Sequence, residues 1–145
     1  MNIVINNRPL QGNYRNAQGF FSDYIFKIIE AHQEHAYFLI TDKIAGTSNP
    51  VNGSTTIAIA PVSKNILALK FWYGFKLPSL LKKYAASIFI NINSIASLNT
   101  VTPQCLLVAD IAMLEGLSFS KKDIKLYLNK ATIIIAFSQF DIEYP

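Results

Sequence analysis

Short apolar segments rich in β-branched residues alternate along the chain with longer segments in which apolar residues recur every three or four positions. The short segments are bounded by Asn, Gly, Pro, Asp or Ser, which is typical of β-strands. Six strands are predicted, at Ile3–Ile5, Tyr37–Thr41, Thr55–Ala60, Ile88–Ile92, Cys105–Ala109 and Thr132–Phe137. Strands that alternate with helices predict parallel pairing through right-handed crossovers.

Two helices are predicted from one-sided apolar patterns and from end signals. The first covers about Gly19–Ala31. Its apolar face is formed by Phe21, Tyr24, Ile25, Ile28 and Ile29. The other begins after Ser120, which has the side chain of an N-cap and is followed three residues later by Asp123. It is expected to end at about Asn129.

A longer helical region is predicted over about Ser63–Tyr84. Leu67, Phe71 and Phe75 sit four apart, which is typical of the apolar face of a helix. The pattern continues through Leu77, Leu80, Leu81 and Tyr84. Pro78 is expected to split the region, because proline lacks a backbone N–H and clashes with the preceding turn.

The composition indicates an α/β fold in a single domain of residues 1–145. Apolar residues make up 51% of the chain and charged residues 15%, against about 25% charged in an ordinary domain. This predicts strands covered on both faces, as in an open, mostly parallel sheet with helices on both sides. Residues Ala45–Ser54 are predicted to form a surface loop.

Charge, cysteine content and the two chain ends bear on the partners, the location and the length of the protein. The net charge of +4 comes without long basic runs, so no nucleic-acid partner is expected. The single cysteine, Cys105, and a start without a signal-peptide pattern suit the cytoplasm. No apolar run approaches the ~20 residues of a membrane span. Ser138 resembles the N-cap of a further helix, so a longer protein is expected to continue after Pro145.

Ligands of open parallel sheets bind at the carboxyl ends of the strands. Four predicted loops are therefore candidates: Asn6–Gln18, Asn91–Asn99, Asp110–Leu117 and the turn at Ser138. Asp110 directly follows a predicted strand, where a carboxylate can accept sugar hydroxyls or act as a general base. The alternative is that Asp110 caps its own turn.

The first of these segments is polar and leads into a helix, whose N-terminus favours anions. The candidate contacts to a phosphate or a sugar, in this segment and at the glycine that follows it, are Arg8, Gly12, Arg15 and Gly19. The glycine spacing matches neither the dinucleotide-binding fingerprint nor the P-loop. The alternative is a surface loop with glycine at a turn.

Three further features favour a structural interpretation. His32 and His35 have the spacing of a metal pair, but no third ligand is near, so a solvated helix end is expected and no metal or cofactor is predicted. Cys105 lies in an apolar strand and is expected to be buried. The aromatic segment Phe71–Phe75 is expected to pack in the core. Lysines accompany this segment, at Lys64, Lys70, Lys76, Lys82 and Lys83.

The distribution of these lysines around the helix axis indicates whether the aromatic segment could bind a charged surface. On a regular α-helix, lysines six residues apart scatter around the axis, so no single basic face forms. Solvated lysines beside a packed core are therefore the preferred interpretation. The alternative is contact with a partner domain or, peripherally, with a membrane surface.

Five segments, in order along the chain, resemble family-four glycosyltransferases. The start combines an apolar strand and an Asn-x-Arg turn, Ile3–Leu10, with a glycine entry to the first helix, Gly19-Phe20-Phe21. The others are Leu77–Lys83, Ile88–Asn91, Pro103–Asp110 and Ile133–Phe140. The resemblance covers nearly the whole chain.

The resemblance implies a Rossmann-like domain, the N-terminal, acceptor-side half of a two-domain GT-B enzyme of polysaccharide biosynthesis. In such enzymes a C-terminal domain binds most of the nucleotide-sugar donor, and the acceptor is a glycan or a lipid-linked molecule at the inner face of the membrane. Asp110 is then the catalytic residue. The substrate-binding residues are Arg8, Gly12, Arg15, Gly19, Asn91 and Ser138. This chain on its own is expected to be inactive.

The chain departs from the family at two positions of the expected cleft. Ala109 stands where members commonly carry histidine, and Phe20 where they often carry arginine. The departures predict either a divergent acceptor or a loss of catalysis. The alternative function is a non-catalytic, flavodoxin-like binding or regulatory module.

Overall fold

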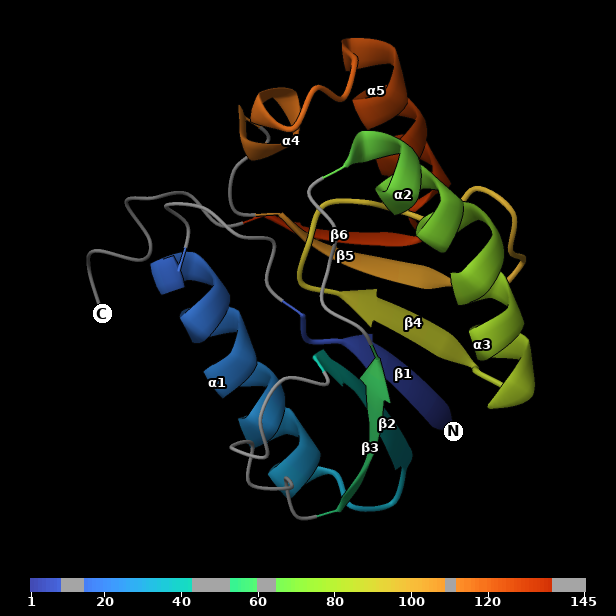
Figure 1. The fold of residues 1–145 in the computed structure, drawn as a ribbon. Helices are drawn as coiled ribbons and strands as arrows, with labels where there is room; N and C mark the ends of the chain where they lie inside the picture. Colours follow the sequence, from blue (N-terminus) through green and yellow to red (C-terminus); the bar gives the residue numbers. More distant parts are fainter. Residues whose placement is uncertain (9–14, 43–52, 60–64, 109–111, 137–145) are drawn as a thin grey trace.

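A parallel sheet forms the centre of the molecule. The computed structural model describes residues 1–8, 15–42, 53–59, 65–108 and 112–136, without the side chains of residues 15–21, 42, 112 and 113. Within these residues six strands, all parallel, lie in the order β3-β2-β1-β4-β5-β6 (Figure 1). They are β1 (Asn2–Asn6), β2 (Ala36–Asp42), β3 (Ser54–Ile59), β4 (Ile88–Asn91), β5 (Gln104–Val108) and β6 (Ile133–Ala136). The predicted strands and the predicted Rossmann-like α/β sheet are confirmed, with small shifts at the strand ends.

Helices cover both faces of the sheet, as Figure 1 shows. They are α1 (Arg15–Ala31), α2 (Ile66–Phe71), the π-helical η1 (Trp72–Lys76), α3 (Leu77–Lys83), α4 (Ala112–Gly116) and α5 (Lys121–Lys130). On one face the strands pack against α1 through Ile25 and Ile29. On the other face they pack against the remaining helices through residues such as Leu77 and Tyr127. Because successive strand residues point to opposite faces, Val4 joins the second core while Ile3 and Ile5 join the first.

The chain reverses direction across the sheet between β1 and β4. From β1 it winds outward to β2 and β3, then crosses back to β4 on the other side of β1 and winds outward again to β5 and β6. The parallel register of β1 and β4 pairs Asn6 with Asn91 at their carboxyl ends. In open α/β sheets this switch point is where ligands bind.

One helix boundary and one additional helix differ from the prediction. Helix α1 begins at Arg15, not at Gly19, so Gly19 lies inside the helix and does not form its entry. The apolar stripe is confirmed at Ile25 and Ile29, whereas Tyr24 is exposed. Helix α4 occupies part of the segment Asp110–Leu117 that was predicted as a loop. At five residues it is too short to show a helical apolar pattern.

The region predicted over Ser63–Tyr84 contains one continuous helical path, in which α2, η1 and α3 follow one another. Its buried face is formed by Leu69, Tyr73, Leu77 and Leu81. Leu67, Phe71 and Phe75 are exposed, so the prediction that they form the apolar core face is wrong. Both sets have a spacing of four residues, and periodicity alone does not distinguish them.

Pro78 does not split this helical path, contrary to the prediction. It lies in the first turn of α3, where a missing N–H is tolerated. In the π-turn before it, the Leu77 N–H donates to the carbonyl of Trp72, five residues back. The Gly74 carbonyl, which residue 78 would meet in a regular α-helix, accepts a hydrogen bond of 2.9 Å from Asn99 Nδ2 instead.

Helix α5 has the N-cap that the sequence predicts. The Asp123 N–H donates to Ser120 Oγ at 3.1 Å, and the Ser120 N–H donates to Asp123 Oδ2 at 3.4 Å, which together form a capping box. The Ser120→Ala variant is expected to lose about 1 kcal/mol of unfolding free energy, measured by urea denaturation. Ser79→Ala, at an exposed position inside α3, is the matched control and is expected to stay within about 0.5 kcal/mol of wild type. Equal stability of the two variants would contradict the capping role.

Candidate functional site

Two buried asparagines end the neighbouring strands β1 and β4 at the switch point. Asn6 Nδ2 donates a hydrogen bond of 3.0 Å to Asn91 Oδ1, and both side chains are fully buried. Each also donates to the hydroxyl of Tyr73 on η1, at 3.1 Å. We refer to Asn6, Asn91 and Tyr73 as the amide cluster. It joins the ends of two strands to one helix.

Asn91 uses its full hydrogen-bonding capacity inside the chain. Besides the two bonds within the amide cluster, Asn91 Nδ2 donates to the Ile95 carbonyl at 2.7 Å, and Asn91 Oδ1 accepts from the Asn93 N–H at 3.1 Å. An asparagine amide has two donors and two acceptor positions, so all four are satisfied. Asn91 therefore shapes the loop that follows β4.

A second buried amide fixes the other end of this loop. Gln104, the first residue of β5, accepts from the Ser97 N–H and donates to the Ser97 carbonyl, both at 2.8 Å. The loop residues between these anchors, 92–97, are all buried. The connection from β4 to β5 is thus held in place by side-chain amides, although it contains no helix.

Arg8 lies beside the amide cluster and over an aromatic ring. Its guanidinium carbon is 4.3 Å from the centroid of the Trp72 ring, a cation–π geometry. Its Nε donates to Asn6 Oδ1 at 3.4 Å, and its carbonyl accepts from Asn93 Nδ2 at 3.0 Å. The side chain is buried. A delocalised cation is therefore placed at the carboxyl ends of the central strands.

The π-turn brings two consecutive aromatic residues to this place. Trp72 stacks on Arg8, and Tyr73 bonds to Asn6 and Asn91. Burial raises the pKa of the Tyr73 phenol above its ordinary value. The hydroxyl stays protonated at neutral pH and acts as a hydrogen-bonding group in the cluster.

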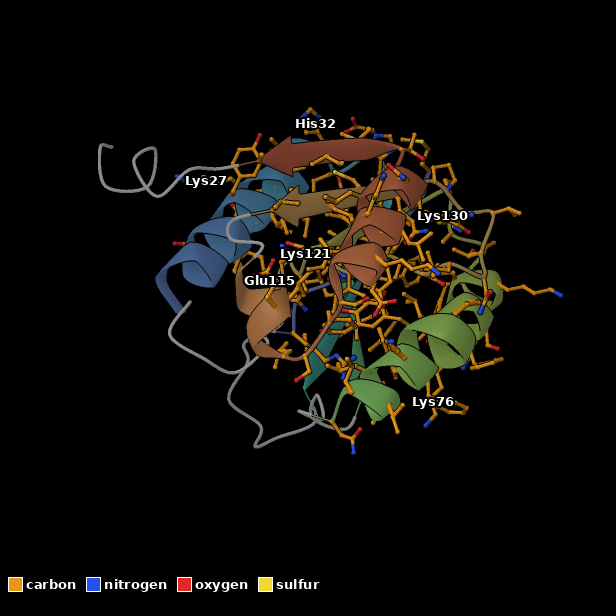
Figure 2. The ribbon with its side chains drawn as sticks, turned by 90° about the horizontal axis from the view of Figure 1, so that it is seen from above. Lys27, His32, Lys76, Glu115, Lys121 and Lys130 are labelled. Carbon is orange, nitrogen blue, oxygen red and sulfur yellow. The ribbon has the colours of Figure 1, made fainter. Side chains whose placement is uncertain are left out.

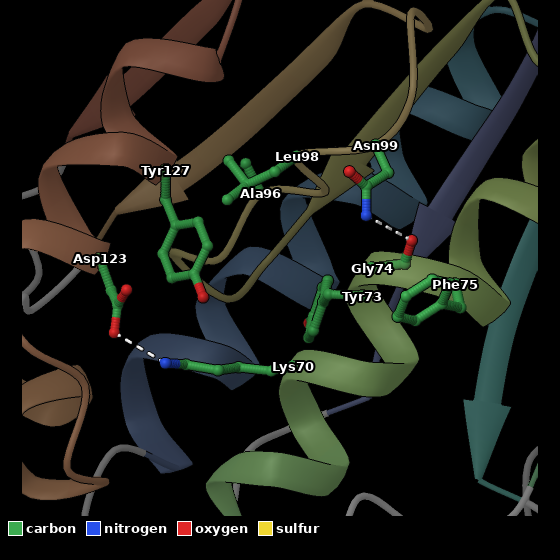
Figure 3. A pocket seen from close by; sticks show the side chains of 9 residues that line it. All are labelled: Lys70, Tyr73, Gly74, Phe75, Ala96, Leu98, Asn99, Asp123 and Tyr127. Atoms are coloured by element: carbon green, nitrogen blue, oxygen red, sulfur yellow. Dashed lines mark hydrogen bonds and ion pairs between the residues drawn. The ribbon is translucent and has the colours of Figure 1, made fainter.

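A pocket of about 210 Å³ lies next to the amide cluster, between η1, α5 and the loop after β4 (Figure 3). Tyr73 contributes to both the pocket and the amide cluster. In the lining of this pocket, Lys70 Nζ and Asp123 Oδ2 form an ion pair of 3.0 Å. The hydrogen bond from Lys70 lowers the pKa of the Asp123 carboxyl. Burial, together with the charge of Asp123, raises the pKa of Tyr127 to about 12. At neutral pH the pocket thus combines an ion pair with neutral phenols.

The structure brings together two of the residues that the sequence selected, Arg8 and Asn91. Arg15 and Gly19 both belong to α1 and do not form a loop. Gly12, Asp110 and Ser138 lie outside the described residues, so their predicted roles remain predictions. The polar residues that sequence reasoning missed are Asn6, Tyr73, Asn93 and Gln104. In the sequence they could have been noticed as polar residues next to apolar strands and, for Tyr73, on the apolar face of a helix.

The structure places the histidine pair and Cys105 as the sequence predicts, but it places only part of the aromatic segment in the core. Glu34 lies 3.4 Å from His32 and 3.6 Å from His35, at the exposed end of α1. Cys105 is buried in β5, and burial raises the pKa of its thiol. Neither observation indicates a nucleophile or a metal ligand. The aromatic segment is divided between the core, which takes Tyr73, and the surface, which takes Phe71 and Phe75.

The amides and the phenol at the switch point bond to groups of the chain itself, so they hold the strand ends and Arg8 in place. Among the described residues of this place, the guanidinium of Arg8 is the group whose chemistry suits hydroxyl, phosphate or carboxylate oxygens. Such a group orients a ligand, whereas proton removal needs a carboxylate or an imidazole.

No protein-family model, curated protein or solved structure matches this chain. Within the described residues, no group of three or more His, Cys, Asp or Glu side chains is placed to hold a metal ion. None of the described helices combines the length and the apolar character that crossing a bilayer requires. The geometry at the switch point is therefore the main guide to function.

The amide cluster is expected to stabilise the domain. In the Asn91→Ala variant, Asn6 and Tyr73 each lose a buried hydrogen-bonding partner, which costs about 1–3 kcal/mol of unfolding free energy. Urea denaturation measures this loss. Asn129→Ala, at an exposed position on α5, is the matched control and is expected to change stability by less than about 0.5 kcal/mol. An Asn91 variant as stable as the Asn129 variant would show that the cluster does not stabilise the fold.

Proposed function

We propose that this chain is the acceptor-binding, N-terminal domain of a two-domain glycosyltransferase. The enzyme would transfer a sugar from a nucleotide-sugar donor to a glycan or to a lipid-linked acceptor. A second domain would bind most of the donor, so the chain by itself would be inactive. The reaction would take place in the cytoplasm, where nucleotide sugars are supplied.

The observation that carries the proposal is the amide cluster with Arg8 at the switch point. Asn6 and Asn91 join the ends of β1 and β4 through a side-chain hydrogen bond of 3.0 Å, and Arg8 Nε donates to the side chain of Asn6. Open α/β sheets bind their ligands at this place. The resemblance of five ordered segments to family-four glycosyltransferases agrees with it, because the first segment contains Arg8 and the third ends at Asn91.

In this proposal the groups at the switch point have separate roles. Arg8 supplies positive charge and hydrogen-bond donors near the acceptor or the phosphates of the donor. Asn91 shapes the loop after β4, whose exposed end at Leu98 and Asn99 reaches the surface. Asp110, which follows β5 in the sequence, would accept the proton of the acceptor hydroxyl as that oxygen attacks the anomeric carbon.

Substitution of Asp110 tests the proposal in the full native protein. With the donor and acceptor that support transfer, Asp110→Ala is expected to lower kcat by about 100-fold or more, since a general base contributes that much. The KM for the donor should change little, because the donor is held mainly by the other domain. Glu115→Gln, which removes an exposed carboxylate on α4, is the matched control and should retain wild-type kinetics. Unchanged transfer by the Asp110 variant would remove this residue from the mechanism.

A further inference from the structure

Three large apolar side chains form a line on the outer side of the α2–η1 helix. Leu67 is 73% exposed, Phe71 53% and Phe75 62%. The rings of Phe71 and Phe75 lie 5.3 Å apart, centroid to centroid, and pack against each other. We call these three residues the ridge. Scattered exposed apolar residues are ordinary, but a continuous line of them marks an interaction surface.

The π-turn keeps the ridge straight. In a regular α-helix a step of four residues overshoots one full turn by about 40°, so three residues spaced by four drift around the axis. The wider turn of η1, with its bond from the Leu77 N–H to the Trp72 carbonyl, reduces this drift. The buried line through Tyr73 and Leu77 therefore stays on the core side, and the ridge stays exposed, with Phe75 also bordering the pocket of Figure 3.

The helix that carries the ridge is basic. Between Asp42 and Asp110 the sequence contains no acidic residue, and it contains six lysines. On this helix Lys70, Lys76, Lys82 and Lys83 are exposed, and Lys70 is paired with Asp123 of α5 at 3.0 Å. Figure 2 shows Lys76 on the outer side of this helix. Lys82 and Lys83 follow Phe75 by seven and eight residues, which places them two turns further along the same side.

We propose that the ridge and its lysines bind the surface of a membrane that contains anionic lipids. Leu and Phe side chains insert into the boundary between headgroups and acyl chains, and lysines beside them attract anionic headgroups. The helix lies in the plane of the membrane surface. This inference does not depend on the transferase reaction proposed above.

The shape and the size of the surface favour a bilayer over a protein partner. A stable protein interface buries about 800 Å² on each partner. An aromatic side chain buries roughly 150–250 Å², and the ridge exposes only part of two rings and one leucine. A bilayer surface accommodates a narrow ridge without a complementary groove, and the absence of acidic residues in this part of the sequence suits an anionic surface.

Vesicle binding by the full native protein tests the inference. Vesicles of phosphatidylcholine alone are compared with vesicles that also contain phosphatidylglycerol, and the bound fraction is measured by sedimentation. The wild-type protein is expected to bind the anionic vesicles at low salt. Binding should fall steeply in about 1 M NaCl, where the Debye length is about 3 Å.

Two sets of substitutions assign this binding to the ridge. Phe71→Ser/Phe75→Ser is expected to lower the partition coefficient at least about tenfold, because two rings leave the membrane interface. Lys76→Gln/Lys82→Gln/Lys83→Gln is expected to lower it by about tenfold or more on anionic vesicles. The matched controls are Tyr24→Ser/Leu126→Ser, at exposed apolar positions of α1 and α5, and Lys121→Gln/Lys122→Gln/Lys125→Gln on α5. Both controls should bind like wild type.

Three results would overturn the inference. The first is a wild-type protein that binds neither kind of vesicle at low salt. The second is a ridge variant that folds, as judged by its thermal midpoint, and binds anionic vesicles as tightly as wild type. The third is a photo-reactive residue at position 75 that captures one protein and no lipid in cells, which would assign the ridge to a protein partner. If the double serine variant does not fold, the lysine variant decides between the outcomes.

Discussion

The hydrogen bond between Asn6 and Asn91 is the contact on which the rest of this structure depends. It joins the two strands at which the chain reverses its direction across the sheet. A buried amide has to be fully paired, because each lost partner costs a desolvation penalty. Tyr73 supplies the next partner and attaches η1 to the strand ends, and Arg8 then lies between Asn6 and Trp72. Strand register, helix position and the charge at the site are therefore set together.

The π-turn gives one helix an inner and an outer side, which meet at the pocket lined by Tyr73 and Phe75. Its inner side places Trp72 and Tyr73 at the switch point, while its outer side presents Phe71 and Phe75 to solvent. The irregular turn persists because Asn99 satisfies the Gly74 carbonyl that Pro78 leaves without a donor. π-turns inside α-helices are found frequently at functional sites. The same helix thus connects the proposed acceptor site to the proposed membrane contact.

Local patterns in the sequence were sufficient for the sheet and for the cap of α5, because strand composition and the Ser120–Asp123 pair are signals within a few residues. The core face of the second helical region was not predictable. Apolar residues recur every four positions both from Leu67 and from Leu69, and only the second set is buried. The continuity at Pro78 depends on Asn99, which is distant in sequence. Of the candidate site, Arg8 and Asn91 could be selected from their positions, but their shared neighbours Asn6 and Tyr73 emerge only from long-range packing.

In the proposed function this domain forms the acceptor side of a larger, two-domain enzyme. The intact mass of the native protein, purified from its own cells, distinguishes this arrangement from a domain that works alone. We expect a mass of about 40 kDa, which corresponds to two domains. A mass near the 16.2 kDa of this chain would rule out the two-domain enzyme and would leave a domain that works alone as a binding module.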